Sequence, residues 1–279
     1  MTVRIVTDST CDLPADEVRR HGITVVPLSV FFGDEGLLDG IDITAADFYD
    51  RMTAYKGLPR TSQPSVELFQ DAYRSLAGDG VEIVSIHVSS KLSGTLNAAS
   101  VAREVVKHEV KVDLIDSYNV SLGLGLIVLE AARAAQAGAT VPEVVAIARR
   151  AMDRVSVHVV VDTLEYLQKG GRIGRARSFL GSVLSIKPII RVEDGEVAPF
   201  ERVRTRSKAV ERMFELASNM PRAKEMFVGC SGDDTDALAL IERLRPLLPH
   251  TDLKLGYLGP VVGVYTGPNA LGIAALERE

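Results

Sequence analysis

The chain has 279 residues, of which 46% are hydrophobic and 25% are charged. These values are ordinary for a globular protein and exclude wholesale disorder, collagen and coiled coil. The formal net charge of -5 argues against a general nucleic-acid binder or anionic-membrane binder, because such proteins carry a net basic surface.

The cysteines and the apolar runs lead us to expect a cytoplasmic protein. Cys11 and Cys230 are too few for a disulfide framework and fit a reducing compartment. The N-terminal residues show no basic segment followed by an apolar one, so no signal peptide is expected. The longest apolar run, over 120–129, is shorter than the about 20 residues that span a bilayer, so we expect no stable membrane insertion.

The first half of the chain alternates β-branched runs with helical patterns. Strands are expected at 3–7, 82–88 and 110–116, and an extended run at 23–32, in which Pro27 indicates an edge or a bulge. Helices are expected at 14–21, 44–54, 65–77, 92–107, 121–136 and 141–154. Thr44 with Asp47, and Thr140 with Glu143, form capping boxes. Such alternation predicts an α/β fold with a mostly parallel sheet and flanking helices.

The second half has a different pattern, typical of an α+β layer with antiparallel pairing. Strands are expected at 155–162, 189–192, 197–200, 201–203, 226–230 and 253–258, with a hairpin turn at Asp194-Gly195. Helices are expected at 207–217 and 236–247, with a short final helix from Pro268. We therefore expect an N-terminal α/β domain over 1–160 and a C-terminal α+β domain over 161–279, with a cleft between them.

Motifs for nucleotides, metals and nucleophiles are weak. Gly123 and Gly125 supply two glycines of a dinucleotide fingerprint, but they lie in an apolar helix, where close helix packing explains them better. The five histidines lack ligand spacing, and Asp233, Asp234 and Asp236 are typical helix-capping residues. No GxSxG elbow occurs. We expect no metal and no cofactor.

Small hydroxyl residues gather where the predicted strands end. They occur in TDST at 7–10, TSQPS at 61–65, SS at 89–90, SGT at 93–95 and DS at 116–117. Ligands of open α/β sheets bind beyond the carboxyl ends of the strands, and hydroxyls with backbone N–H groups at helix starts hold anions. Each residue alone is also a common helix cap. Capping and an anion site therefore remain open as interpretations.

Basic residues concentrate in segment 169–208, which has ten Lys or Arg residues against four Asp or Glu residues. A solvated face is one interpretation of this segment. A docking surface for an acidic partner or a phosphate is the other, since the guanidinium group suits bidentate contacts with such groups.

Taken together, these segments make the chain similar to the DegV family of bacterial fatty-acid-binding proteins. The matching segments are VTDST at 6–10 with DLP at 12–14, TSQPS at 61–65, SGT at 93–95, DS at 116–117, LQKGGRI at 167–173, IKPI at 186–189, VRTR at 203–206 and TGP at 266–268. They follow the family order over essentially the whole chain. The resemblance implies a two-domain α/β protein that holds one long-chain fatty acid in a tunnel between or beneath the two domains.

The resemblance also implies a partner and a site. Family members of this kind are the binding subunit of a fatty-acid kinase, whose kinase subunit phosphorylates the bound carboxylate, so the chain itself is not expected to be the enzyme. The residues expected at the carboxylate are Thr61, Ser62, Ser93, Gly94, Tyr265 and Thr266. Arg172 and Arg204 are expected to face the kinase or the transferred phosphate.

Two departures and two alternatives accompany this expectation. Tyr265 stands where the family often has a histidine, and a phenol donates a hydrogen bond without the charge of an imidazolium. Asn269 stands where glycine is frequent. One alternative is an enzyme for a small phosphorylated or acyl substrate, with Asp8 and Asp116 as bases. The other is a regulatory protein that senses lipid.

Overall fold

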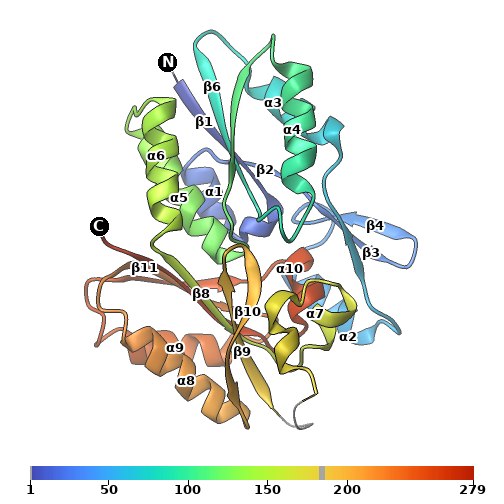
Figure 1. Cartoon of the computed structure of the whole chain (residues 1–279), viewed down its shortest axis with the longest axis vertical. Helices are drawn as coiled ribbons and strands as arrows, with labels where there is room; N and C mark the ends of the chain where they lie inside the picture. The colour runs from blue at the N-terminus through green and yellow to red at the C-terminus, as the bar shows by residue number, and fades with distance from the viewer. Residues whose placement is uncertain (1, 182–185) are drawn as a thin grey trace.

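A computed structural model describes residues 2–181 and 186–279 of the chain, which form three sheets with helices packed on them (Figure 1). The first sheet is parallel throughout, as expected for the N-terminal half. Its strand order is β2 (Thr24–Val26), β1 (Thr2–Asp8), β6 (Val81–His87) and β7 (Lys111–Asp116).

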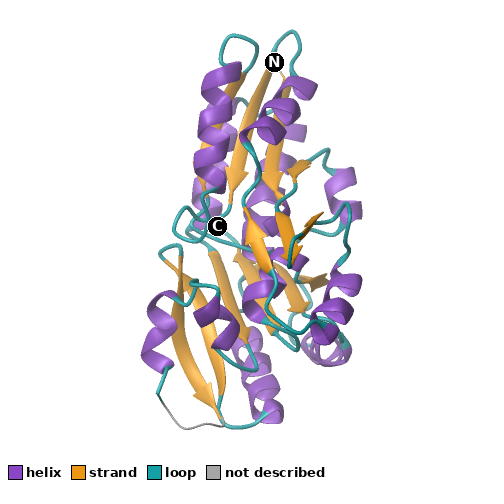
Figure 2. Ribbon diagram, turned by 90° about the vertical axis from the view of Figure 1, so that its right-hand side faces the viewer, coloured by secondary structure: helices purple, strands orange, loops and turns teal. Residues whose placement is uncertain are grey.

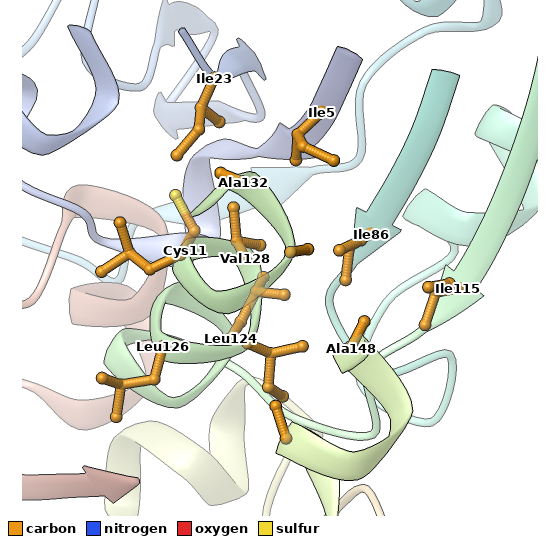
Figure 3. Packing of buried hydrophobic residues seen from close by; sticks show 14 of the residues in the cluster. Ile5, Cys11, Ile23, Ile86, Ile115, Leu124, Leu126, Val128, Ala132 and Ala148 are labelled. Atoms are coloured by element: carbon orange, nitrogen blue, oxygen red, sulfur yellow. The ribbon is translucent and has the colours of Figure 1, made fainter. Parts of the chain in front are cut away.

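Helices cover both faces of this parallel sheet. On one face, Phe69 and Tyr73 pack with Val6 and Ile83 in a buried cluster. The helices of this face are α3 (Val66–Leu76) and α4 (Thr95–Val106). The opposite face is covered by α5 (Leu122–Gln136) and α6 (Val141–Met152). Figure 3 shows side chains from α5 and α6 gathered with Ile5, Ile86 and Ile115 of the sheet.

A six-stranded mixed sheet forms from the second half of the chain, and Figure 2 shows the two larger sheets one above the other along the long axis. Its order is β10 (Glu196–Val203), β9 (Lys187–Glu193), β8 (Val155–Val160), β13 (Leu271–Glu277), β11 (Ala223–Cys230) and β12 (Asp252–Tyr257). Every neighbouring pair is antiparallel except β11 with β12. One face packs on α8 (Arg206–Ser218) and α9 (Thr235–Leu244).

Helix α5 lies between the two larger sheets, and this position explains its sequence. Its residues from Leu122 to Leu129 are all buried, and they share a cluster with Ile5 of β1 and Val157 of β8. A helix that is apolar all round needs partners on all sides. A Cβ at Gly123 would lie 2.4 Å from Cγ2 of Val157, so close packing, not a nucleotide site, accounts for this glycine as expected.

A small antiparallel sheet forms the third element of the fold. Its order is β4 (Glu35–Leu38), β3 (Ser29–Phe32) and β5 (Arg60–Ser62), and it packs with α2 (Ala45–Ala54) and α10 (Pro260–Thr266). The extended run predicted at 23–32 is split at Pro27, where the chain leaves the parallel sheet for this one. The shorter elements are η1 (Ser9–Cys11), α1 (Ala15–Arg20), α7 (Glu165–Lys169) and η2 (Gly174–Phe179).

The predicted capping box of Thr140 and Glu143 and the predicted hairpin are confirmed, whereas Thr44 caps α2 without the reciprocal bond from its own N–H to Asp47. The Thr44 hydroxyl accepts a hydrogen bond from the Asp47 N–H at 3.2 Å, and the Glu143 carboxylate accepts one from the Thr140 N–H at 2.8 Å. Asp194 and Gly195 have φ values of 52° and 78°, the left-handed geometry of a two-residue hairpin turn. The segments 197–200 and 201–203 form one strand, β10, with an irregularity in register between Pro199 and Glu201.

The expected final helix from Pro268 is wrong. Residues Leu271–Glu277 form β13, which pairs with β8 on one side and β11 on the other. Its Leu- and Ala-rich sequence favours a helix locally, but burial between two strands overrides that preference. The helix at the end of the chain is α10, before Pro268, and it ends at Gly267 with φ of 72°.

The division into domains at 160/161 stays a prediction. Strand β8 ends at Val160 and pairs within the six-stranded sheet, so the chain changes sheets before Val155.

Among residues 2–181 and 186–279, no helix combines the length and apolarity needed to cross a membrane.

Candidate binding cavity

A cavity of about 500 Å³ lies where the three sheets meet, within the range of about 300–1,000 Å³ typical of small-molecule sites. It is walled by the starts of α4 and α5, by β5, β8, β9, β10 and β13, and by α10. Its apolar lining consists of Leu28, Val88, Leu92, Val120, Leu122, Val157, Val159, Leu167, Ile190, Val192, Val197, Leu258, Val261, Val262, Ile273 and Ala274.

Almost all of the predicted site residues line this one cavity. Those that do are Thr61, Ser62, Ser93, Gly94, Arg172, Tyr265 and Thr266. Arg204 is not among the lining residues, because it is exposed in the turn between β10 and α8. The cavity therefore combines a long apolar wall with a group of hydroxyls and two arginines, Arg172 and Arg191, of which Arg191 is paired with Glu193.

Thr61 on β5 and Tyr265 on α10 are joined through their hydroxyls, which lie 2.5 Å apart. Either hydroxyl can donate to the other, but the pair has two protons and uses one of them in this hydrogen bond. The second proton stays available for a bound acceptor such as a carboxylate. Two segments far apart in sequence thus form one donor group.

The start of α4 supplies a second group of donors. The Ser93 hydroxyl accepts a hydrogen bond from the Thr95 N–H at 3.3 Å and lies 2.8 Å from the Thr95 hydroxyl. Gly94 has no room for a side chain, because a Cβ there would lie 2.0 Å from Oε1 of Gln63. The glycine therefore lets Gln63 lie directly over the helix start, where backbone N–H groups favour an anion.

Arg172 places a positive charge beside these hydroxyls. Its Nε donates to the carbonyl oxygen of Leu92 at 3.0 Å, and its Nη1 donates to that of Gly170 at 2.9 Å. Its guanidinium lies 5.2 Å from the centre of the Tyr265 ring. Within the described ranges, no Asp or Glu forms an ion pair with Arg172. A ligand carboxylate would supply the missing countercharge.

Two predicted residues use their hydroxyl protons elsewhere. The Ser62 hydroxyl donates to the carbonyl oxygen of Gln63 at 3.1 Å, and Ser62 is exposed. The Thr266 hydroxyl donates to the carbonyl oxygen of Val262, one turn earlier in α10, at 3.3 Å. Both line the cavity, but they are poorer donors to a ligand than Thr61, Ser93 and Tyr265.

Asp8 is buried, which argues against its predicted alternative role as a base. Its carboxylate accepts from the Thr10 hydroxyl at 2.5 Å and the Val88 N–H at 3.0 Å, and it lies 2.9 Å from Nδ1 of His87. Its oxygens are thus occupied inside the protein. In residues 2–181 and 186–279, no group of three or more His, Cys, Asp or Glu side chains is placed to hold a metal ion.

Sequence reasoning missed four polar residues of the cavity. Arg191 was counted only as part of the basic segment 169–208. Gln63 lies in the segment TSQPS at 61–65 and Thr10 in the segment TDST at 7–10, but neither was predicted to contact the carboxylate. Ser121 carried no signal in the sequence beyond its place as the first residue of a predicted helix. Its unusual backbone conformation appears only in the structure.

Similarity to known proteins extends over almost the whole chain. The sequence profile of the DegV family matches residues 2–278. The chain belongs to the DegV family. A DegV domain-containing protein of Streptomyces coelicolor is 40% identical over 280 residues, which cover 99% of both chains, and the DegV protein of Bacillus subtilis is 34% identical over 278 residues, which cover 98% of both.

Solved structures of DegV proteins share the whole fold. A DegV family protein from Thermus thermophilus, described for its fatty acid binding, superposes with a TM-score of 0.91 at 34% identity and covers 100% of both chains. DegV of Bacillus subtilis, a fatty acid binding protein, gives 0.91 at 32% identity with the same coverage. A stearic acid-binding protein from Eubacterium ventriosum gives 0.91 at 28% identity and covers 99% of this chain and 98% of the other. These matches establish the mixed α/β DegV architecture.

Proposed function

We propose that this chain binds one long-chain fatty acid in the cavity, with the carboxylate among Thr61, Ser93, Gly94 and Tyr265. The observation that carries the proposal is a single cavity of about 500 Å³ with a long apolar wall and a group of hydroxyls at one place. Similar DegV proteins from Thermus thermophilus and Bacillus subtilis bind fatty acids, which supports the same ligand class here.

The apolar wall supplies the affinity. Burial of an acyl chain contributes about 0.8 kcal/mol per methylene, hence on the order of 10 kcal/mol for a tail of about 14 methylenes. Lost freedom of the ligand offsets part of this gain. The remainder supports a complex that persists through purification.

The polar group supplies orientation. A carboxylate removed from water needs several hydrogen bonds or a countercharge. The proposal assigns it one proton from the Thr61–Tyr265 pair, one from the Ser93–Thr95 pair, the Gly94 N–H, and the field of Arg172. We propose that these donors leave one carboxylate oxygen free to react.

We further propose that the chain works in the cytoplasm as a binding subunit that presents this oxygen to a partner kinase. The kinase would supply ATP and form the acyl phosphate. The lack of a phosphate-binding loop and the buried position of Asp8 support a role other than catalyst. Arg172 at the cavity and the exposed Arg204 would attract the partner or the transferred phosphate, and domains 1–160 and 161–279 would enclose the ligand.

The binding proposal is tested by titration of delipidated protein with palmitic acid. Thr61→Val with Tyr265→Phe keeps the shape of the site and removes one donor to the carboxylate. We expect Kd to rise about tenfold or more, because a hydrogen bond to a charged group contributes about 1.5–3 kcal/mol. Thr235→Val at the exposed start of α9 is the control, and an equal Kd in the double variant would refute the assignment.

The kinase proposal is tested with a bacterial fatty-acid kinase subunit and labelled ATP. We expect acyl phosphate only when both proteins are present, and less of it with Arg204→Glu than with the control Arg245→Glu, which changes another exposed arginine. Acyl phosphate formed by this chain alone would instead favour the enzyme alternative. Equal rates for the two variants would remove Arg204 from the contact surface.

A further inference from the structure

Besides the hydroxyls around Tyr265, the cavity has a second polar region, which lies near the opposite end of α10. The hydroxyl of Ser121, which lines the cavity, lies 2.5 Å from Oδ2 of Asp12. The other oxygen of Asp12, Oδ1, accepts a hydrogen bond from the Gly259 N–H at 3.0 Å, just before α10 begins. Asp12 thus holds Ser121 against the start of the helix whose end carries Tyr265.

The polar region at Ser121 and the polar region at Tyr265 are well separated along the cavity. Tyr265 follows Gly259 by six positions, and a rise of about 1.5 Å per residue places these two backbone positions about 9 Å apart along α10. The residues beside Ser121 on the cavity wall include Leu122, Leu258 and Val261, all apolar. A hydroxyl therefore interrupts the wall that the acyl chain would follow.

Ser121 adopts a backbone conformation that favours glycine. Its φ is 57° and its ψ is -145°, and Asp12, its partner, has φ of 50°. Non-glycine residues in such regions are rare and cluster at functional sites, where the surrounding structure imposes them. Helix capping does not account for Ser121, because its hydroxyl makes no cap hydrogen bond with α5 and is directed at Asp12 instead.

The hydrogen-bonding capacity of Ser121 selects the chemistry of a ligand group. If Asp12 is ionised, Ser121 donates to it, and the serine oxygen still accepts from a ligand hydroxyl. If Asp12 is protonated, it donates to Ser121, whose own proton then points elsewhere. Removal from solvent raises the pKa of Asp12 well above its ordinary value, which favours the second state. A ligand hydroxyl satisfies Ser121 in both states, because it donates and accepts.

We infer that Ser121, held by Asp12, is a subsite for a hydroxyl group near the middle of the acyl chain, so that the ligands include mid-chain hydroxy fatty acids. The inference rests on the proposed function and names a substrate class for the same cavity. An extended chain advances about 1.25 Å per carbon, as bonds of about 1.5 Å in a tetrahedral zigzag require. The backbone separation of about 9 Å then corresponds to about seven carbons, which places the hydroxyl near the middle of a long acyl chain.

The test compares the affinities of octadecanoic, 10-hydroxyoctadecanoic and 18-hydroxyoctadecanoic acids for delipidated protein. Ser121→Gly is the main variant, because glycine adopts the required backbone conformation and removes only the hydroxymethyl group. We expect this variant to raise the Kd for the 10-hydroxy acid about tenfold, since the loss of one hydrogen bond supports a change of that size. The Kd for octadecanoic acid should change less than twofold. The 18-hydroxy acid should respond like octadecanoic acid.

Two further variants make the result specific. Asp12→Asn keeps an acceptor for the Gly259 N–H and donates to Ser121, so it should preserve the relative affinity for the 10-hydroxy acid. Thr61→Val should raise the Kd for all three acids by a common factor. Equal effects of Ser121→Gly on all three acids would overturn the inference, because Ser121 would then affect the cavity as a whole and not a ligand hydroxyl. If octadecanoic acid itself fails to bind, the proposed function is overturned with it.

Discussion

Replacing Asp39 by asparagine should make the protein more stable at neutral pH. Asp39 is 6% exposed and lies between β4 and α2, where its carboxyl faces the backbone N–H of Val261 and the hydroxyl of Ser9. A Cβ at Gly259 would lie 2.6 Å from Oδ1 of Asp12 and 3.7 Å from Oδ1 of Asp39, so the two carboxyls lie close together. Burial raises the pKa of Asp39 from 3.8 to about 7, and the charge of Asp8 adds to the shift.

The sign and size follow from proton linkage. Because the folded protein holds this proton up to a higher pH than the unfolded chain does, Asp39 costs nothing below pH 4 and progressively destabilises the fold as the pH rises to 7. The shift of about three pKa units corresponds to about 4 kcal/mol at 1.36 kcal/mol per unit. Asparagine has no charge to desolvate, so its contribution to the free energy of unfolding does not depend on pH.

The assay is denaturant unfolding of the wild type and Asp39→Asn between pH 4 and 8. The free energy of unfolding of the variant minus that of the wild type should increase by about 4 kcal/mol from pH 4 to pH 8. Most of this increase should occur between pH 4 and 7. A constant offset would only measure the cost of the amide group. Asp34→Asn, at an exposed carboxylate in the preceding turn, is the control. Parallel curves for Asp39→Asn and the wild type would refute the reasoning.

Two further changes probe the site and the contact between the sheets. Gly94→Val should displace the Gln63 side chain from the start of α4, because a Cβ there overlaps Oε1 of Gln63, and should raise the Kd for palmitic acid at least tenfold with little change in melting temperature. Arg133→Met should lower the free energy of unfolding by about 2 kcal/mol at pH 7, because Arg133 on α5 donates at 2.6 Å to Glu225, which is 2% exposed. Although burial raises the pKa of Glu225, hydrogen bonds from Arg133 and Lys254 hold it below its ordinary value, so this loss should shrink as the pH falls below 4; a loss independent of pH would contradict the ion-pair explanation.

Local signals in the sequence predicted the parts of the fold that depend on local chemistry. The capping residues Thr44 and Thr140 and the Asp194-Gly195 turn form the hydrogen bonds or backbone angles expected of them. The apolar helix at 121–136 was also predictable, because a segment apolar on every side has to be buried.

Elements defined by tertiary pairing were harder to predict. The segment from Leu271 to Glu277 favours a helix by composition, and only its two antiparallel neighbours make it a strand. The small sheet of β3, β4 and β5 and the helix α10 are short and have no strong periodic pattern. These are the elements that bring Thr61 to Tyr265.

The site was predictable as a set of residues but not as a geometry. Thr61 and Tyr265 are 204 positions apart, and no spacing rule joins them. The hydroxyl groups at strand ends indicated an anion site, and the family resemblance selected among them. The strained Ser121 and the coupled carboxyls of Asp12 and Asp39 required the structure, since burial and backbone angles depend on the whole fold.

The most direct test of the central claim is mass spectrometry of the protein purified without added lipid, in its native state and after denaturing extraction. The account predicts a mass increase of one fatty acid per chain in the native spectrum and a C14–C18 acid in the extract, with occupancy reduced in Thr61→Val with Tyr265→Phe. A chain that carries no lipid and takes up no added fatty acid would contradict the account, and the cavity would then have to serve a different ligand.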